Sequence, residues 1–434
     1  MIELHACKNI YGFTFFRWSK VQVKTLKFLV VGAGGQGAPC ASMLSKDPEV
    51  SEIVLADIDL ELAERVSKKI GSDRITTMRV DAGNLEDLLK AAKGVDAIIN
   101  LTLPRFNLNI REAALKSGAH YVDTAFDETT WSQLSEQKPL EFDEDFRKAG
   151  LTAVIGCGGT PGVTNVLIRY ACDKLDSVDK IRILMGGKPL KEPEEVVEAW
   201  DPGWSPEVAL DDYAEEPIIF EDGKYKRYPP FSGVEKYRFP DPVGPQLVTR
   251  HSHEEPLMIP RFIGKGVKYV DFMYPLDIVA GALVKLGFAS YDPIEVKDIK
   301  VAPRDVLLNL VRRPVNSFFI ENESTVINPP EFAYYLVIEI AGEKAGEKVK
   351  ITLVEGDTDF NADENLKMFR KLGTTHVFVS APAIVGAKMC IKGDADRGVI
   401  APECLNPIKF FKMMAALGVP VKFQETVSKS VTIS

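Results

Sequence analysis

A glycine-rich turn, Gly32-Ala33-Gly34-Gly35-Gln36-Gly37, directly follows the apolar run 28–31 and leads into a predicted helix. In this G-x-G-x-x-G spacing the first glycine allows a tight turn and the second lets a pyrophosphate approach the backbone. The third allows close packing of helix and strand. The free N–H groups and positive dipole end of the helix also favour phosphate. All six residues are therefore predicted to bind a dinucleotide; a tight turn without a ligand is the alternative.

The residue that ends the next predicted strand indicates which dinucleotide binds. Asp57 stands about 20 residues beyond the turn, where a carboxylate accepts hydrogen bonds from the ribose hydroxyls of an adenosine. A 2′-phosphate would be repelled there, and NADP sites usually carry an Arg nearby. Here Ile58 is followed by Asp59 and Glu61, with no basic residue before Arg65. NAD is therefore predicted in preference to NADP, with Ile58 beside the cofactor.

The composition bounds the class of protein. A chain of 434 residues is long enough for two or three domains. A net charge of −9 without a basic run argues against a nucleic-acid partner. No stretch approaches the ~20 apolar residues that span a membrane, so no membrane partner is predicted. The six scattered cysteines predict reduced thiols in a cytoplasmic protein. Cys157 is interpreted as a packed small residue rather than a nucleophile.

Short β-rich runs alternate with helical stretches between residues 27 and 156, which predicts an α/β fold with a doubly wound parallel sheet of the Rossmann type. The predicted strands are 27–32, 52–57, 75–80, 96–101, 119–123 and 151–156. The predicted helices are 36–46, 59–70, 84–92, 107–117 and about 139–149. Ligands of such sheets bind at the carboxyl ends of the strands.

Several strand-end residues are therefore candidates for the site. Asn100-Leu101-Thr102 is predicted to contact the cofactor, with Asn100 and Thr102 at the ribose. Asp81-Ala82 ends the preceding strand and is assigned to the same site. Asp123 would lie near the nicotinamide, where it could bind or orient a substrate amine. A helix N-cap is the alternative role for Asp123.

A second glycine-rich junction spans residues 156–162. Thr160 suits a helix N-cap and Pro161 the first helical position, so a helix is predicted to start there. Backbone N–H groups at such a junction bind carboxylates and phosphates. Because the first turn already takes the pyrophosphate, Gly159, Thr160, Pro161 and Gly162 are predicted to bind an anionic group of the substrate. A glycine-rich connection between domains, without a ligand, is the alternative.

The densest group of titratable residues is Arg250-His251-Ser252-His253-Glu254-Glu255. Imidazoles and carboxylates are the usual general acids and bases near neutral pH. His251, His253 and Glu254 are therefore candidate catalytic residues, and Arg250 a candidate substrate contact. If the segment is extended, both histidines share one face, as in some metal sites, but no third histidine lies nearby and no metal is predicted. A solvated loop is the alternative.

After residue 161 the regular alternation of β-rich runs and helical stretches ends. Two runs, 332–340 and 348–354, predict an antiparallel hairpin in an α+β second domain. Two last helices are predicted at about 379–391 and 404–417. Residues 1–26 are interpreted as an extension, either unstructured, loosely docked or upstream of the true start.

Taken together, these motifs resemble the saccharopine dehydrogenase-like oxidoreductases, most closely the lysine 6-dehydrogenase branch, from about Lys27 to the C-terminus. The matching segments are 32–37, 55–59, 79–83, 160–165, 301–307 and 398–403. The resemblance implies a dinucleotide domain of residues 27–158 with about 375–434. It implies a substrate-binding and dimerisation domain of residues 159–374. It also places Thr160 to Asn165 over the active cleft, so that Asn165 becomes a candidate substrate contact.

The resemblance implies NAD(P)-linked chemistry at a C–N bond of an amino acid, in a homodimer. The favoured reaction is oxidative deamination of a diamino acid, with His253 or Glu254 as the base. The alternatives are a reductive amine–aldehyde condensation of the saccharopine or carboxynorspermidine dehydrogenase type, and a non-catalytic NAD(H) sensor or scaffold. The chain departs from the lysine-type enzymes at residues 251–255, where they carry small residues, so the substrate transfers poorly.

Overall fold

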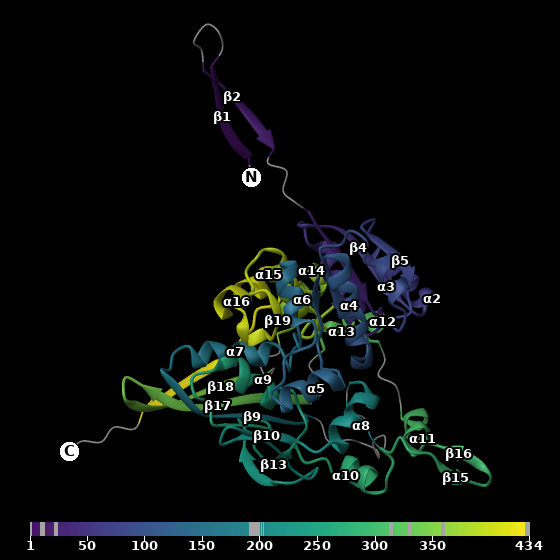
Figure 1. Cartoon of the computed structure of the whole chain (residues 1–434), viewed down its shortest axis with the longest axis vertical. Helices are drawn as coiled ribbons and strands as arrows, with labels where there is room; N and C mark the ends of the chain where they lie inside the picture. The colour runs from purple at the N-terminus through teal and green to yellow at the C-terminus, as the bar shows by residue number, and fades with distance from the viewer. Residues whose placement is uncertain are drawn as a thin grey trace.

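Two β-sheets organise the protein, and both are visible in the computed structural model (Figure 1). The structure describes residues 2–8 and 14–20 by their backbone, and residues 25–190, 200, 202, 204–311, 316–328, 332–356 and 361–429 with their side chains. The purple to blue part of the chain in Figure 1 holds most of the first sheet, and the teal to green part holds most of the second. The yellow end of the chain adds one strand to each sheet.

The first sheet has seven parallel strands in the order β19-β8-β7-β6-β3-β4-β5. Its strands are β3 Leu26–Val31, β4 Val50–Asp57, β5 Ile75–Arg79, β6 Ala97–Asn100, β7 His120–Val122, β8 Thr152–Val154 and β19 Gly398–Ile400. The predicted doubly wound parallel sheet is confirmed. The strand order reverses between β3 and β6, which is where ligands of such sheets bind. β19 was not predicted; it pairs with β8, which lies far earlier in the chain.

Helices cover both faces of this sheet. One face carries α1 Gly37–Lys46, α2 Leu60–Ile70 and α15 Ser380–Ile391. The other face carries α3 Leu85–Ala91, α4 Asn107–Ser117, α5 Glu128–Ser135 and α6 Asp143–Ala149. Of these, α5 was not predicted, although its N-cap Asp127 accepts the N–H of Thr130 at 2.9 Å.

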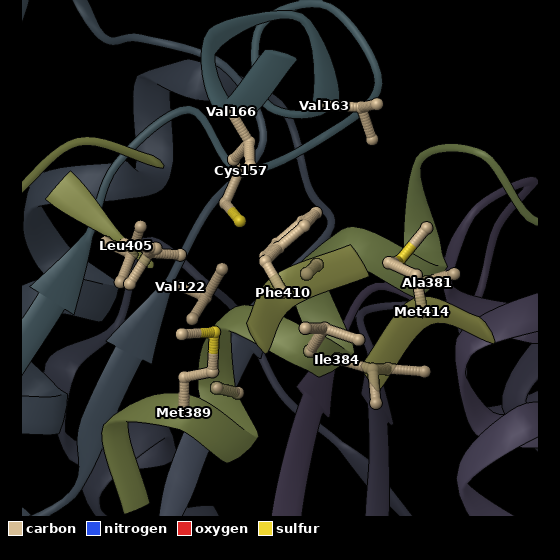
Figure 2. Close-up of a cluster of buried hydrophobic side chains, with 14 of the residues drawn as sticks. Val122, Cys157, Val163, Val166, Ala381, Ile384, Met389, Leu405, Phe410 and Met414 are labelled. Atoms are coloured by element: carbon tan, nitrogen blue, oxygen red, sulfur yellow. The ribbon is translucent and has the colours of Figure 1, made fainter. Parts of the chain in front are cut away.

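The end of the chain returns to the first domain through α15 and α16 Pro407–Leu417. Figure 2 shows Ile384 and Phe410 of these helices in one apolar cluster with Val122 and Cys157. Each such buried side chain stabilises the fold by ~1.5–3 kcal/mol. Cys157 is fully buried and donates its S–H to the carbonyl of Pro382, so its interpretation as a packed small residue is confirmed.

The second sheet is mixed and has nine strands, in the order β11-β10-β14-β9-β17-β18-β20 with β12 and β13 paired beside β14. Its strands are β9 Ser177–Pro189, β10 Ile218–Glu221, β11 Lys224–Arg227, β12 Glu235–Arg238, β13 Pro245–Arg250, β14 Tyr269–Pro275, β17 Phe332–Lys344, β18 Glu347–Gly356 and β20 Gln424–Lys429. The predicted antiparallel hairpin, β17–β18, is confirmed. Because β20 pairs with β18, residues 424–429 belong to this sheet and not to the first domain as expected.

The remaining elements lie around the two sheets. They are β1 Ile2–Lys8, β2 Thr14–Lys20, η1 Pro104–Phe106, α7 Val163–Cys172, α8 Pro206–Ala214, α9 Glu255–Ile263, α10 Ile278–Lys285, β15 Ile294–Val296, β16 Ile299–Val301, α11 Pro303–Leu310, α12 Ser317–Ile320, α13 Glu323–Val326, α14 Ala362–Leu372 and η2 Pro402–Cys404. The backbones of β1 and β2 form an antiparallel hairpin that stands apart from the body in Figure 1, so this part of the extension is not unstructured. Among the helices that the structure describes, none has the length and apolar character of a membrane span.

Candidate active site

The first glycine turn is built as its sequence requires. Gly32 has a φ of +97°, a conformation that side chains disfavour. A Cβ on Gly37 would lie 1.7 Å from the carbonyl oxygen of Gly32, so α1 packs there only with glycine. By contrast, a Cβ on Gly34 or Gly35 would meet no atom within 4 Å in the part of the chain that the structure describes. The backbone at these two residues is therefore open to a ligand.

The surroundings of the turn fit NAD(P). Asp57 Oδ2 accepts the N–H of Ala33 at 2.7 Å, which holds the carboxylate against the turn at the end of β4. The next residue, Ile58, is 56% exposed, an apolar surface beside the acid. The open glycine backbone and the N-terminus of α1 would hold the pyrophosphate, and Asp57 with Ile58 would hold the adenosine.

A cavity of about 760 Å³ opens beside this turn. Gln36 lines it together with Phe378, Glu321 and His376. Ser380 donates its hydroxyl to the carbonyl of Gln36 at 2.7 Å and so fixes the start of α15 against the turn. The turn is thus reachable from the side of the second domain.

The other predicted cofactor residues lie at the same edge of the sheet but differ in access. Asn100 is buried, and its amide donates to Asn107 Oδ1 at 2.8 Å and to the Tyr121 hydroxyl at 3.0 Å. Its carbonyl oxygen accepts the Thr102 hydroxyl at 2.7 Å. Asn100 therefore shapes the strand end from within the protein. Any ribose contact falls to the half-buried segment Leu101-Thr102.

Asp81-Ala82 follows β5 at this edge. Asp81 Oδ1 accepts the N–H of Gly83 at 2.8 Å, and the Ala82 carbonyl accepts the side-chain amide of Asn109 at 2.7 Å. Both contacts hold the loop after β5 in place. Their predicted contact with the cofactor stays a prediction.

Asp123 lies beneath the site rather than in it. Its carboxylate accepts the N–H of Gly156 at 2.6 Å and a guanidinium N–H of Arg111 at 3.3 Å. Arg111 is fully buried and also reaches Asp127 at 3.4 Å. Burial raises the pKa of Asp123 to about 6, although Arg111 opposes this shift. A carboxylate that is 1% exposed does not offer the substrate-binding role predicted for it.

The second glycine turn folds back on itself. The N–H of Gly158 donates to the carbonyl of Pro161, and the N–H of Val163 donates to the carbonyl of Gly158. A Cβ on Gly162, whose φ is +134°, would lie 1.8 Å from the Gly158 oxygen. The helix consequently begins at Val163 with Gly162 as N-cap, so the prediction that Thr160 and Pro161 start it is wrong.

This closure limits what the second turn offers a substrate. The N–H of Gly162 donates to Asn165 Oδ1 at 2.9 Å, and the N–H of Thr164 donates to the carbonyl of Gly159. Asn165 is fully buried. Direct binding by Gly162 or Asn165 is therefore not supported, and the half-buried Gly159 and Thr160 are the predicted contacts that remain accessible.

The predicted His–Glu cluster forms where β13 ends and α9 begins. The ring of His253 stacks on Phe272 with 4.0 Å between ring centroids. Its Nδ1 forms an ion pair with Glu255 Oε2 and lies 3.3 Å from Glu254 Oε2. The three groups would also suit a cation by spacing, since one ligand atom of each lies within 4.8 Å of the others. We interpret them as an ion-pair cluster, because the Glu255 carboxylate already occupies Nδ1.

The charge of this cluster identifies a proton donor. Burial disfavours a charged imidazole, but Glu255, Glu254 and Asp212 outweigh burial and raise the pKa of His253 to about 9. Burial also raises the pKa of Glu254, although His253 opposes it. His253 is thus protonated at neutral pH and suits a general acid, rather than the base that the sequence predicted.

One hydrogen bond joins this cluster to the dinucleotide domain. Phe126, four residues beyond β7, donates its N–H to Glu254 Oε1 at 3.3 Å. The half-buried Asp212 of α8 interacts electrostatically with Glu254 and His253. Its pKa is raised, mainly by burial and next by the negative charge of Glu254. The acid–base cluster therefore lies at the carboxyl edge of the sheet, where the reactive end of a dinucleotide binds.

The other two predicted residues of this segment point to different surroundings. His251 is buried with its ring stacked on Tyr274 at 4.8 Å, and burial lowers its pKa to about 3. So weak a base does not support the catalytic role predicted for His251. Arg250 stacks its guanidinium 3.9 Å above the Tyr228 ring. Among the described contacts, no hydrogen bond joins Arg250 to the cluster, and its substrate contact stays a prediction.

Three residues of this region were missed from the sequence: Asp212, Arg111 and Glu403. Asp212 and Glu403 come from segments distant in the chain, whereas Arg111 lies 12 residues before Asp123. Tertiary packing places all three. Glu403 is fully buried and accepts the Asn165 side-chain amide at 3.2 Å. The weak signals were the acidic pair 211–212 and an acid in the segment 398–403, neither of which indicates a partner.

The fold and the site define a dinucleotide-dependent oxidoreductase with a second domain built on a mixed sheet. Residues 28–154 match the saccharopine dehydrogenase NADP binding domain, and residues 158–419 match the saccharopine dehydrogenase C-terminal domain. The chain belongs to the saccharopine dehydrogenase family and is an NAD(P)-dependent enzyme. The family resemblance predicted from the motifs is confirmed.

Individual relatives are distant but match over nearly their whole length. The carboxyaminopropylagmatine dehydrogenase of Synechocystis sp. is 24% identical over 91% of this chain and 96% of its own. The carboxynorspermidine synthase of Vibrio alginolyticus is 24% identical over 92% and 97%. Among solved structures, the saccharopine dehydrogenase (L-Glu forming) of Saccharomyces cerevisiae has a TM-score of 0.64 at 16% identity, covering 92% of this chain and 100% of that chain.

A second solved structure agrees on the fold. The homospermidine synthase of Legionella pneumophila, in complex with NAD, has a TM-score of 0.60 at 14% identity, covering 94% of this chain and 93% of that chain. Both similarities support the same two-domain architecture.

Proposed function

We propose that the protein reductively joins an amine to an aldehyde at a new C–N bond, using NAD(P)H. The observation that carries this proposal is the cluster of His253, Glu254 and Asp212, held against the dinucleotide domain through Phe126. The names of the Synechocystis and Vibrio relatives support an amine of the polyamine type. Lysine 6-dehydrogenase activity, which the sequence favoured, has no specific support among these relatives and stays a prediction.

The side chains of the cluster suit the two proton transfers of such a condensation. NAD(P)H, when bound, supplies the hydride that reduces the C=N bond. In their ionised form Asp212 and Glu254 favour a cationic amine. Their raised pKa values make them stronger bases for the proton that the amine loses before its nitrogen attacks the aldehyde carbon. Protonated His253 can then donate a proton to the oxygen that leaves as water. Positioned proton transfer of this kind contributes ~10²–10⁴ in rate.

The experiment tests each pair of a polyamine and a small carboxylated aldehyde with the full chain and NAD(P)H. Nicotinamide absorbance measures the oxidation of NAD(P)H, and mass spectrometry detects the secondary amine that is formed. Loss of about 10²-fold or more in rate is expected for His253→Ala and Glu254→Gln. The matched control is Glu216→Gln, an exposed acid of the same domain, which should keep full activity. Binding of NAD(P)H without turnover would favour a sensor, and NADH formation from lysine would favour the oxidative reaction.

We also propose that the protein is a homodimer. Large apolar side chains are exposed on α10, on α11 and on the β15–β16 hairpin, among them Ile278 at 78% and Leu310 at 77%. Apolar surfaces of this kind mark interaction sites. Light scattering of the full chain tests this proposal, and a mass of one chain would contradict it.

A cytoplasmic location is proposed on the cysteines. Those whose side chains the structure describes are free thiols, and four of them are buried. Reduced thiols are typical of cytosolic proteins. Fractionation of the host cell would test the location.

A further inference from the structure

Two buried carboxyl groups lie behind His253. Glu255 and Glu403 are fully buried, and the Oε1 atom of each has no hydrogen-bond partner among the described residues. α9, which begins at Glu255, packs against η2, which contains Glu403. The two carboxyl groups are close enough to interact electrostatically.

The other oxygen of each group is already bound. Glu255 Oε2 forms the ion pair with His253 Nδ1. Glu403 Oε2 accepts an N–H of the Asn165 amide at 3.2 Å. The orientation of that amide is fixed, because Asn165 Oδ1 must accept the N–H of Gly162 at 2.9 Å. Each carboxyl group is therefore left with one oxygen that lacks a partner, in a region without exposure to water.

We propose that Glu403 carries a proton and donates it to Glu255 Oε1, which makes Glu403 a positioning residue for the Glu255–His253 ion pair. One O–H···O bond gives both lone oxygens a partner, whereas a buried acceptor without one is costly. It also avoids two adjacent buried anions, because like charges at close range do not both ionise. The negative charge then stays on Glu255, where His253 requires it.

The groups around Glu403 agree with this placement of the proton. Burial raises the pKa of Glu403 to about 8, and Glu255 adds to the shift, while Asn165 and Arg169 oppose it. Burial likewise raises the pKa of the nearby thiols, so they add no charge. The titratable groups facing Glu403 are Glu255, Arg169, Cys157 and Cys404; those facing His253 are Glu254, Glu255, Asp212 and His251.

The hydrogen bonds then form one chain from the second glycine turn through Asn165, Glu403 and Glu255 to His253. The position of the proton is a property of the protein without substrate. Its consequence for turnover rests on the proposed function, and the two are measured separately.

The direct test is infrared spectroscopy and thermal unfolding of the full chain with Glu403→Gln, Glu403→Leu and the control Cys404→Ala. Gln keeps a donor at this place, and Leu removes it. We expect one component of the protonated-carboxyl band near neutral pH that is lost in Glu403→Gln and retained in Cys404→Ala. A carboxyl group whose pKa is higher in the folded than in the unfolded protein contributes its full stabilisation below the unfolded-state pKa. That stabilisation is lost as the pH rises through the folded-state pKa. The melting temperature of Glu403→Gln relative to wild type should therefore rise from about pH 5 to about pH 8.

An unchanged infrared spectrum in Glu403→Gln, or a melting difference that is flat across this range, would show an ionised Glu403 and overturn the proposal. If these measurements confirm the proton on Glu403 and the wild-type enzyme still turns over no amine–aldehyde pair, only the proposed function is refuted. If Glu403→Leu fails to fold, the Glu403→Gln comparisons still decide.

Discussion

The two glycine-rich turns of this protein look alike in sequence but are used differently. In the first, the backbone at Gly34 and Gly35 faces open space. In the second, Gly158 and Gly162 contact each other, and the N–H groups of Gly158, Val163 and Thr164 donate to carbonyls of the turn. Glycine indicates that something comes close to the backbone, but not whether that is a ligand or the chain itself. The first turn is a binding surface, and the second is a structural joint beside the active site.

The largest expected effect tests the structural joint. Gly162→Ala places a Cβ 1.8 Å from the Gly158 oxygen at a φ of +134°, so the turn must rearrange. We expect a loss of about 4 kcal/mol or more in the free energy of unfolding, measured by urea denaturation. Gly34→Ala is the matched control in the open turn and should change stability by less than about 0.5 kcal/mol. Equal losses in both variants would remove the distinction between the turns.

The next effect concerns the ion pair to which the joint leads. Glu255→Gln should lower the pKa of His253 from about 9 by roughly two units, a change of about 2.7 kcal/mol, because burial then acts with less opposition. NMR titration measures this shift, and the His120 signal serves as the control. The raised pKa stabilises the protein fully below the ordinary value of 6.5, and this is lost as pH rises through about 9. Wild type should show that loss and Glu255→Gln should not.

The same comparison shows which parts of the site could be predicted from sequence. The first turn, Asp57 and the His–Glu segment are contiguous or regularly spaced, so their chemistry is local and visible. The helix start after the second turn was misplaced because it depends on contact between Gly158 and Gly162. Asp212 and Glu403 reach the cluster only through packing of distant helices, which no local pattern records.

The fold divides in the same way. The alternation of strands and helices predicted the first sheet and the β17–β18 hairpin, because each element buries one face with a recognisable period. β19 and β20 are short, and their membership is decided by a partner strand far away in the chain. The structure does not support the predicted catalytic use of His251 for a related reason, because its aromatic neighbours come from other elements.

A smaller effect tests the open turn as a binding surface. Gly34→Ala adds a methyl group where no atom of the described residues lies within 4 Å, and where a pyrophosphate would approach. We expect the affinity for NAD(P)H to fall by about tenfold or more, or ~1.4 kcal/mol, with stability unchanged. Fluorescence titration with NAD(P)H measures it, and Gly71→Ser, a distant helix C-cap, is the control for affinity. Unchanged affinity in Gly34→Ala would place the cofactor elsewhere.

The smallest expected effect decides between the two nicotinamide cofactors. Asp57 accepts the N–H groups of Ala33 at 2.7 Å and Asp59 at 2.9 Å, so Asp57→Asn keeps an acceptor oxygen but removes the charge. Without that charge a 2′-phosphate is no longer repelled, and we expect the preference for NADH over NADPH to fall about fivefold, or ~1 kcal/mol. Paired titrations of wild type and variant with both cofactors measure the ratio. A wild type that already prefers NADPH would show that another group neutralises Asp57. The open turn and Asp57 would then not determine which cofactor binds.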